Sequence, residues 1–175
     1  LVHTWSRFVE PTLKSLRCAP AGEPVGCPPA LMLVNAFQRL CRTVYLSRPT
    51  RSLVGGDRVA ILTDLLHETP AQVIGVALAW YGCDARLLTS EQYGGVRAID
   101  RFREYVRAGV PALTVVLGSG PSCANTVQDL IARYGGPTFI VGADTPDILA
   151  TQVQRVRTVS ACVEEALALL APQAD

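Results

Sequence analysis

Side chains able to do chemistry are few in this 175-residue chain, and His67 and Glu68 are the best placed of them. They follow the apolar run "RVAILT" (58–63), which predicts a buried strand, and precede an apolar stretch at 70–81, which predicts a helix. Ligands of parallel α/β sheets bind where strands end, so this loop suits ligand contact. A solvated loop without a function would hold the same two residues, and that alternative stays open.

Other chemical motifs are weak. The turn "VVLGSGPSC" (115–123) could cradle an anion on a helix N-terminus, but it lacks the lysine of a phosphate loop and does not match GxGxxG. A tight strand-to-helix turn explains its glycines equally well. His3 and His67 are the two histidines, which excludes a histidine-rich metal site and leaves no credible Ser–His–acid set. We therefore expect that the protein is not an enzyme.

The six cysteines form no CxxC pair and have no zinc-finger spacing. This predicts reduced core thiols in a cytoplasmic protein. Cys18 and Cys27 are exceptions, because they fall in a Pro/Gly connector at 18–29 where a thiol could sense oxidation.

Strands and helices alternate from residue 58 onward, which predicts right-handed βαβ units and a flavodoxin-like, five-stranded parallel sheet. The expected helix at 70–81 has Thr69 as N-cap and ends with Trp80 and Tyr81 in the core or against the sheet. Two helices, at 1–17 and 30–46, precede it, so we expect a helical-bundle unit at 1–50 and a flavodoxin-like domain at 55–175. The predicted strands are 58–63, 84–89, 111–120, 137–144 and 156–160, and the other predicted helices are 95–107, 122–134, 146–154 and 161–170.

Charge and hydropathy exclude several classes of partner. The net charge is +1, which gives no electrostatic case for nucleic acid or a membrane surface. No apolar run approaches the roughly 20 residues of a membrane span. Arg7, Glu10 and Lys14 interrupt the first apolar pattern, so we expect no signal peptide.

Three stretches together resemble a known module: "W..FVEPTLKSL" (5–16), "GDRVAILT" (56–63) and "TFIVGADTP" (138–146). The chain is similar to the cobalamin (B12)-binding module of MerR-type light- and B12-responsive transcription regulators and of corrinoid methyltransferases. The resemblance implies a helical bundle that caps the corrin and a flavodoxin-like domain that binds the nucleotide tail. It also implies a histidine that coordinates cobalt.

The signature residues of that family depart from its pattern here. With its E/DxxHxxG motif anchored on Gly75, Thr69 and Gln72 take the places of the acid and the axial histidine. His67 could then coordinate cobalt only through a rebuilt loop. In the W-x9-E-H motif of the bundle, Cys18 takes the tryptophan position and Pro28-Pro29 the Glu-His. The serine after the third strand corresponds to Ser119, and the paired glycine after the fourth strand reads Gly142-Ala143.

The resemblance therefore implies a cytoplasmic sensory or regulatory domain that has lost or changed its cobalamin ligand. An alternative is cobalamin or another tetrapyrrole bound without an axial histidine, in a groove lined by Thr69, Gln72, Ser119 and Gly142 with Cys18 above it. A corrinoid enzyme subunit is a further alternative that Gln72 disfavours. The identity of any cofactor stays open, a small-molecule ligand and a homo-oligomer are allowed, and DNA would be bound only through a domain outside this chain.

Overall fold

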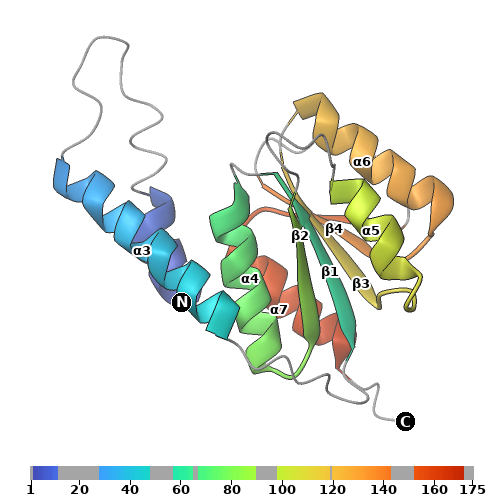
Figure 1. Cartoon of the computed structure of the whole chain (residues 1–175), viewed down its shortest axis with the longest axis horizontal. Helices are drawn as coiled ribbons and strands as arrows, with labels where there is room; N and C mark the ends of the chain where they lie inside the picture. Colours follow the sequence, from blue (N-terminus) through green and yellow to red (C-terminus); the bar gives the residue numbers. More distant parts are fainter. Residues whose placement is uncertain are drawn as a thin grey trace.

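The computed structural model describes residues 2–11, 28–47, 57–64, 67–89, 98–118, 120–142 and 152–171 (Figure 1). Cys18, Cys27, Ser119 and Ala143 lie outside these residues, as does most of the helix predicted at 146–154. None of the described helices is both long and apolar enough to cross a bilayer.

Five parallel strands form one sheet in the order β2-β1-β3-β4-β5. The register pairs Thr63 of β1 with Thr89 of β2 on one side and with Leu117 of β3 on the other. This order and direction confirm the predicted flavodoxin-like fold. The strands are β1 (Arg58–Thr63), β2 (Asp84–Thr89), β3 (Leu113–Leu117), β4 (Thr138–Val141) and β5 (Val153–Val156).

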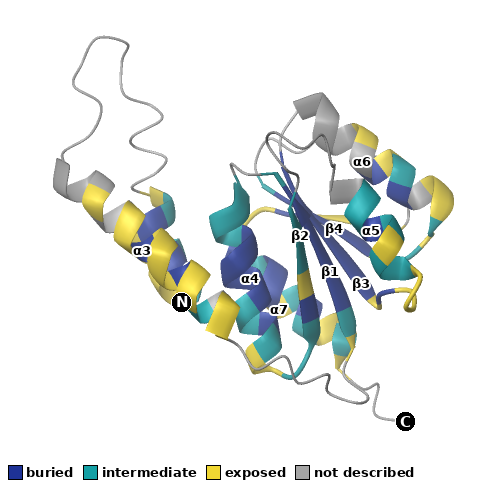
Figure 2. Ribbon diagram, viewed as in Figure 1, coloured by how far each residue is buried: buried dark blue, intermediate teal, exposed yellow. Residues whose placement is uncertain are grey.

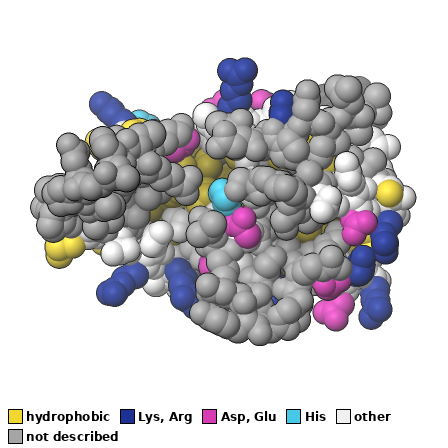
Figure 3. Space-filling view, turned by 90° about the horizontal axis from the view of Figure 1, so that it is seen from above, with side chains coloured by type: hydrophobic (Ala, Val, Ile, Leu, Met, Phe, Trp, Pro, Cys, Tyr) yellow, Lys and Arg dark blue, Asp and Glu magenta, His cyan; other side chains and the backbone are white. Residues whose placement is uncertain are grey.

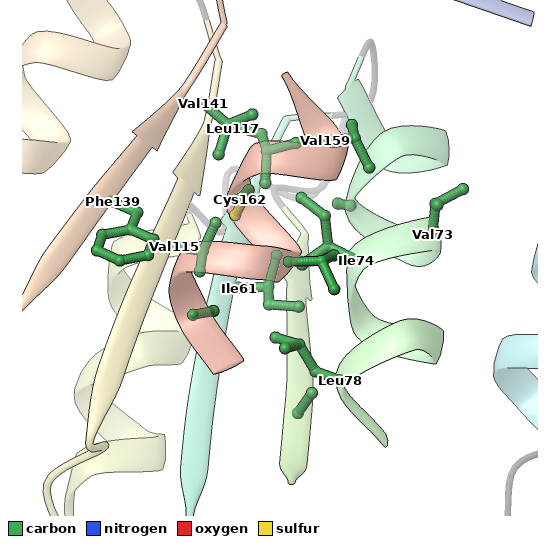
Figure 4. Close-up of a cluster of buried hydrophobic side chains, with 14 of the residues drawn as sticks. Ile61, Val73, Ile74, Leu78, Val115, Leu117, Phe139, Val141, Val159 and Cys162 are labelled. Carbon is green, nitrogen blue, oxygen red and sulfur yellow. The ribbon is translucent and has the colours of Figure 1, made fainter. Parts of the chain in front are cut away.

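Alternation along the strands builds a core on each face of the sheet. Ile61 and Val115 point to the face covered by α4 (Glu68–Trp80) and α7 (Val159–Leu170), with Ile74 and Cys162 among their neighbours in the larger cluster (Figure 4). Leu62 and its strand neighbours join a second cluster with residues of α5 (Ala98–Val106) and α6 (Gly120–Arg133). Helices therefore cover both faces, and the central strands β1, β3 and β4 read as nearly continuous apolar runs because both of their sides are buried (Figure 2).

Three details of the predicted elements are wrong. The helix α4 begins at Glu68 with His67 at the N-cap, so Thr69 is inside the first turn and is not the cap. The last strand is Val153–Val156 and not 156–160, because Thr158 already caps α7 through a hydrogen bond to the Ala161 amide. Trp80 and Tyr81 are 86% and 67% exposed, so neither is in the core.

The N-terminal helices pack on the outer side of α4 and α7 and share their core. They are α1 (Val2–Thr4), the π-helix η1 (Trp5–Val9) and α3 (Pro28–Ser47). Trp5 and Phe37 contact each other at 6.0 Å between ring centroids and belong to the same buried cluster as Val73 of α4. The hydroxyls of Ser6 and Ser160 are 2.6 Å apart and join η1 to the start of α7.

Candidate functional site

The strand order reverses at β1, because β2 and β3 lie on opposite sides of it. In this fold class the carboxyl end of such a strand is the usual ligand-binding position. The chain leaves β1 for β2 on one side, and β3 lies on the other side of β1. Open α/β sheets bind ligands at such a switch point. Asp64 follows β1 here, and the buried Gly118 follows β3.

Asp64 and His67 form a close pair at this position. The Nδ1 atom of His67 lies 2.7 Å from Oδ1 of Asp64, and the backbone amide of His67 donates to the same oxygen at 2.9 Å. An ionised carboxylate can only accept hydrogen bonds, so Nδ1 carries the proton that it shares with Asp64. Nε2 is then the nitrogen with a free lone pair in the neutral ring, the form that binds metals.

The sequence explains why the pair forms locally. Asp64 is the first residue beyond the strand, and its side chain bonds the amide of the third residue along, as an N-terminal capping side chain does. His67 also donates its amide to the carbonyl of Asp64 at 3.3 Å, which closes a turn. The imidazole is therefore fixed by the same turn that starts α4, with a side-chain exposure of 23%.

Gln72, predicted at the axial position, is buried within α4. Its side-chain amide donates to Oε1 of Glu68 at 2.9 Å, one helical turn earlier, and its overall exposure is 4%. Gly75 is buried in the middle of the same helix. Thr69 is half-buried in the first turn of α4. Glu68 and Gln72 are thus hydrogen-bonded to each other, and His67 is hydrogen-bonded to Asp64.

Gly142 is the other described residue that sequence analysis assigned to the groove. Its φ of 138° is a conformation that residues with a Cβ rarely adopt, and its amide donates to the Val156 carbonyl at 3.0 Å. The end of β4 therefore requires glycine for backbone reasons. Ser119, Ala143 and Cys18, the remaining candidates, lie outside the described residues.

Viewed onto the carboxyl edge of the sheet, a histidine with a carboxylate beside it lies next to hydrophobic side chains near the middle of the face (Figure 3). Arginine side chains lie at the rim of this view. The described residues include no group of three or more His, Cys, Asp or Glu able to enclose a metal ion. Among the described residues, the site therefore presents one imidazole that is oriented by one carboxylate.

The Asp64–His67 pair has a signal in the sequence that the anchor on Gly75 hides. Anchored instead on Asp64, the pattern E/DxxHxxG places the acid at Asp64 and the histidine at His67 with no gap. Pro70 then stands at the glycine position. The spacing of three residues between an acid and a histidine after a buried strand is the feature that would have identified the pair.

The described cysteines do not contribute a reactive thiol to the site. Cys41, Cys83 and Cys162 are free thiols, and burial raises the pKa of each. The pKa of Cys41 is about 11, and that of Cys162 is about 12, with the charge of Glu165 adding to the effect of burial. A raised pKa suppresses the thiolate. Cys41 and Cys162 are buried core thiols, as the sequence predicted, and Cys83 is partly buried against the same core.

Comparisons with known proteins give one distant structural similarity to report and no match in sequence. No family model matches the chain, and no curated protein matches it. Among solved structures it is similar to "Crystal structure of exonuclease RecJ bound to manganese", with a TM-score of 0.40 and 16% sequence identity. The match covers 78% of this chain and 39% of that one, so this chain spans about two fifths of the exonuclease.

This match contradicts one prediction from the sequence. We expected that the protein is not an enzyme, and the protein that it matches is an exonuclease. The expectation is corrected accordingly, because it rested on motifs that are missing and not on any feature incompatible with catalysis. At this level of similarity the match assigns no role to any residue of the chain.

Proposed function

We propose that this chain is a sensory module of the cobalamin-binding kind, and that His67 is the residue that coordinates the cobalt of a corrinoid. The observation that carries the proposal is the 2.7 Å contact between Nδ1 of His67 and the carboxylate of Asp64, at the carboxyl end of β1. It supplies what the anchor on Gly75 lacked, which is an imidazole at the ligand-binding edge of a flavodoxin-like sheet.

The residues present fit such a ligand in two respects. A carboxylate that accepts from Nδ1 fixes the tautomer and raises the basicity of the ring for a metal at Nε2. Imidazole is also a suitable ligand for transition metals, whereas an amide such as that of Gln72 is a poor one. When bound, a corrinoid would supply a redox-active cobalt centre. His67 would hold it through Nε2, and Asp64 would fix the orientation of the imidazole.

The regulatory part of the proposal rests on the resemblance to MerR-type regulators. Such a domain would pass the state of its ligand to other parts of a regulator, with DNA bound by a domain outside this chain. A cytoplasmic setting is part of the same proposal, and the free thiols Cys41, Cys83 and Cys162 are consistent with it.

The two histidines give a matched pair of variants for the test. Purified protein is incubated in the dark with hydroxocobalamin or adenosylcobalamin, desalted, and its visible spectrum is recorded. We expect corrin to co-elute at near-stoichiometric amounts with the wild type and with His3→Ala, whose residue is exposed on α1. His67→Ala should lower the affinity about tenfold or more. Equal binding by His67→Ala would remove His67 from the proposal, and no binding by the wild type would remove the corrinoid.

A further inference from the structure

The first described segment of the chain buries few of its side chains. Residues 2–11 form one helical run, which consists of α1, η1 and the next two residues, and we name this run the N-terminal strap. Its two buried residues are Trp5 and Val9, which are 4% and 2% exposed. Half of its ten residues are exposed, and these are His3, Thr4, Arg7, Phe8 and Pro11. The packing of the strap therefore depends mainly on two side chains.

One of these two side chains carries a polar group that its surroundings do not satisfy. Trp5 packs against Phe37 of α3, with the ring centroids 6.0 Å apart. The indole Nε1 of Trp5 is buried, and among the residues that the structure describes none accepts a hydrogen bond from it. Burial of a donor without an acceptor is unfavourable, because the donor loses its hydrogen bond to water. Hydration of this donor would therefore offset part of the apolar contact that is lost when the strap opens.

The backbone of the strap is irregular at the same place. Trp5–Val9 form a π-helix, and the amide of Glu10 donates to the carbonyl of Trp5. π-Helical turns are rare and occur frequently at functional sites. The π-helix and the indole nitrogen are separate observations, and both belong to the stretch that carries the buried contacts of the strap.

A pair of hydroxyls joins the strap to α7. Oγ of Ser6 lies 2.6 Å from Oγ of Ser160, which is the second residue of α7, and the contact is partly buried. This hydrogen bond involves neither Trp5 nor Phe37. Substitution of Ser6 therefore weakens the closed position of the strap and leaves its apolar contacts in place.

The inward face of α3 lies beneath the strap. Phe37 contacts Trp5, and Cys41 follows Phe37 by one helical turn and has no exposure. The strap and α3 run in roughly opposite directions (Figure 1), so the turn of α3 after Phe37 lies beside the turn of the strap before Trp5. That turn of the strap carries Val2, which packs against the cluster that holds Cys41. The closed strap therefore helps to bury Cys41.

We propose that the N-terminal strap opens as a unit while the rest of the protein stays folded, and that it controls access to the inward face of α3 at Phe37 and Cys41. Segments with few buried apolar contacts open at a lower free energy than the core of a domain. Cys162 provides the contrast, because it lies between α7 and the sheet and is reached only when the domain unfolds (Figure 4). The proposal does not depend on the identity of the ligand at His67.

Alkylation of the two buried thiols tests the proposal. The protein is incubated with iodoacetamide in water and in low concentrations of urea, and the modification of each cysteine is followed by mass spectrometry of its peptide. Cys41 and Cys162 are both 0% exposed, and each rate is divided by the rate in the unfolded chain. We expect Cys41 to react at least tenfold faster than Cys162, with a rate that depends little on urea because a local opening exposes little surface. Equal rates with equal urea dependence would overturn the proposal.

Three variants show which part of the molecule opens. Ser6→Ala should speed the alkylation of Cys41 about threefold or more, because the closed strap loses its bond to α7. Ser47→Ala is the matched control at an exposed position of α3 and should leave that rate unchanged. Ile61→Val weakens the core beneath α4 and should speed the alkylation of Cys162 but not that of Cys41. A Cys41 rate that responds to Ile61→Val and not to Ser6→Ala would assign its exposure to global unfolding and overturn the proposal.

Hydrogen exchange provides an independent measurement of the same opening. The amide of Glu10 is bonded to the Trp5 carbonyl within the π-helix, so it exchanges when the strap opens and this bond breaks. We expect its opening equilibrium constant to agree within about threefold with the constant from the alkylation of Cys41. A Cys41 thiol that reacts while the Glu10 amide stays protected would mean that α3 moves and the strap does not, and this result would also overturn the proposal.

Discussion

Polar side chains differ in their hydrogen bonding between the amino edge of the sheet, where the strands begin, and the carboxyl edge, where they end. At the amino edge, Arg58 has its guanidinium 4.1 Å from the centre of the Tyr105 ring and donates to the carbonyls of Tyr105 and Gly109. At the carboxyl edge, Asp64 holds one nitrogen of His67, and no described residue bonds the other. A polar side chain whose hydrogen-bonding groups all have partners within the protein stabilises the fold. One that is fixed in place and keeps a free donor or acceptor is available to a ligand.

The largest effect expected at the amino edge comes from Gly109→Ala. Gly109 has a φ of 135°, and a Cβ there would lie 2.7 Å from a guanidinium nitrogen of Arg58. We expect the free energy of unfolding to fall by about 1–3 kcal/mol, because the backbone conformation is strained for alanine. Denaturant titration measures this loss. Gly136→Ala, where the nearest atom would be 3.9 Å away, is the control and should change little.

Arg58→Ala should have a smaller effect on the same edge. It removes two hydrogen bonds to carbonyls and the contact with Tyr105, and we expect a loss of about 1–2 kcal/mol in the free energy of unfolding. Retention of corrin should be unchanged once the protein is folded. If Arg58→Ala kept the full free energy of unfolding, the polar contacts of Arg58 at the amino edge would not stabilise the fold.

Asp64→Asn separates stability from ligand binding at the carboxyl edge. Asparagine can still accept the His67 amide, and the Asp64 side chain is 41% exposed, so the change in unfolding free energy should stay below about 0.5 kcal/mol. The affinity for corrin should fall about tenfold, because the ring loses its carboxylate partner. Equilibrium titration followed by the visible spectrum measures it, with Asp57→Asn as an exposed control. Unchanged affinity would argue that Asp64 serves only to begin α4.

The ionisation of Cys162 has the smallest expected effect, because it does not change the free energy of unfolding at neutral pH. Its pKa is raised to about 12 in the folded protein from a usual value of 9.0, so the unfolded chain loses its proton first as pH rises. Stability is therefore full below pH 9 and declines between pH 9 and 12. Cys162→Ala should make the decline shallower in denaturant titrations at pH 8, 9 and 10. An identical decline in both proteins would mean that other groups cause it.

Much of the fold could be predicted from the sequence, because strands buried on both faces read as continuous apolar runs. "RVAILT" and "TFIV" are such runs, and α4 lies where an apolar stretch follows the first of them. The ends of elements could not be predicted as well. The helix α4 begins at Glu68, directly after the turn in which Asp64 accepts from the His67 amide, and not at Pro70 after a Thr69 cap. Trp80 is exposed although it ends an apolar stretch.

The candidate site was only half visible in the sequence. The loop after β1 and His67 itself were identified, but an alignment anchored on Gly75 assigned the axial position to Gln72. That glycine is buried in the middle of α4, so it is a helix-packing position and a poor anchor for a loop motif. The hydrogen bond between Asp64 and His67 is local to one turn, but it depends on the backbone conformation of that turn, which residue types alone do not fix.

The most direct test of the central claim is electron paramagnetic resonance of the protein loaded with cob(II)alamin, prepared with ordinary and with ¹⁵N-labelled histidine. Coupling of the unpaired electron to one axial ¹⁴N nucleus splits each cobalt line into three, and coupling to ¹⁵N splits it into two. The account predicts that the labelled protein changes from three lines to two, and that His67→Ala does not. A threefold splitting that persists in the labelled wild-type protein would contradict coordination by His67.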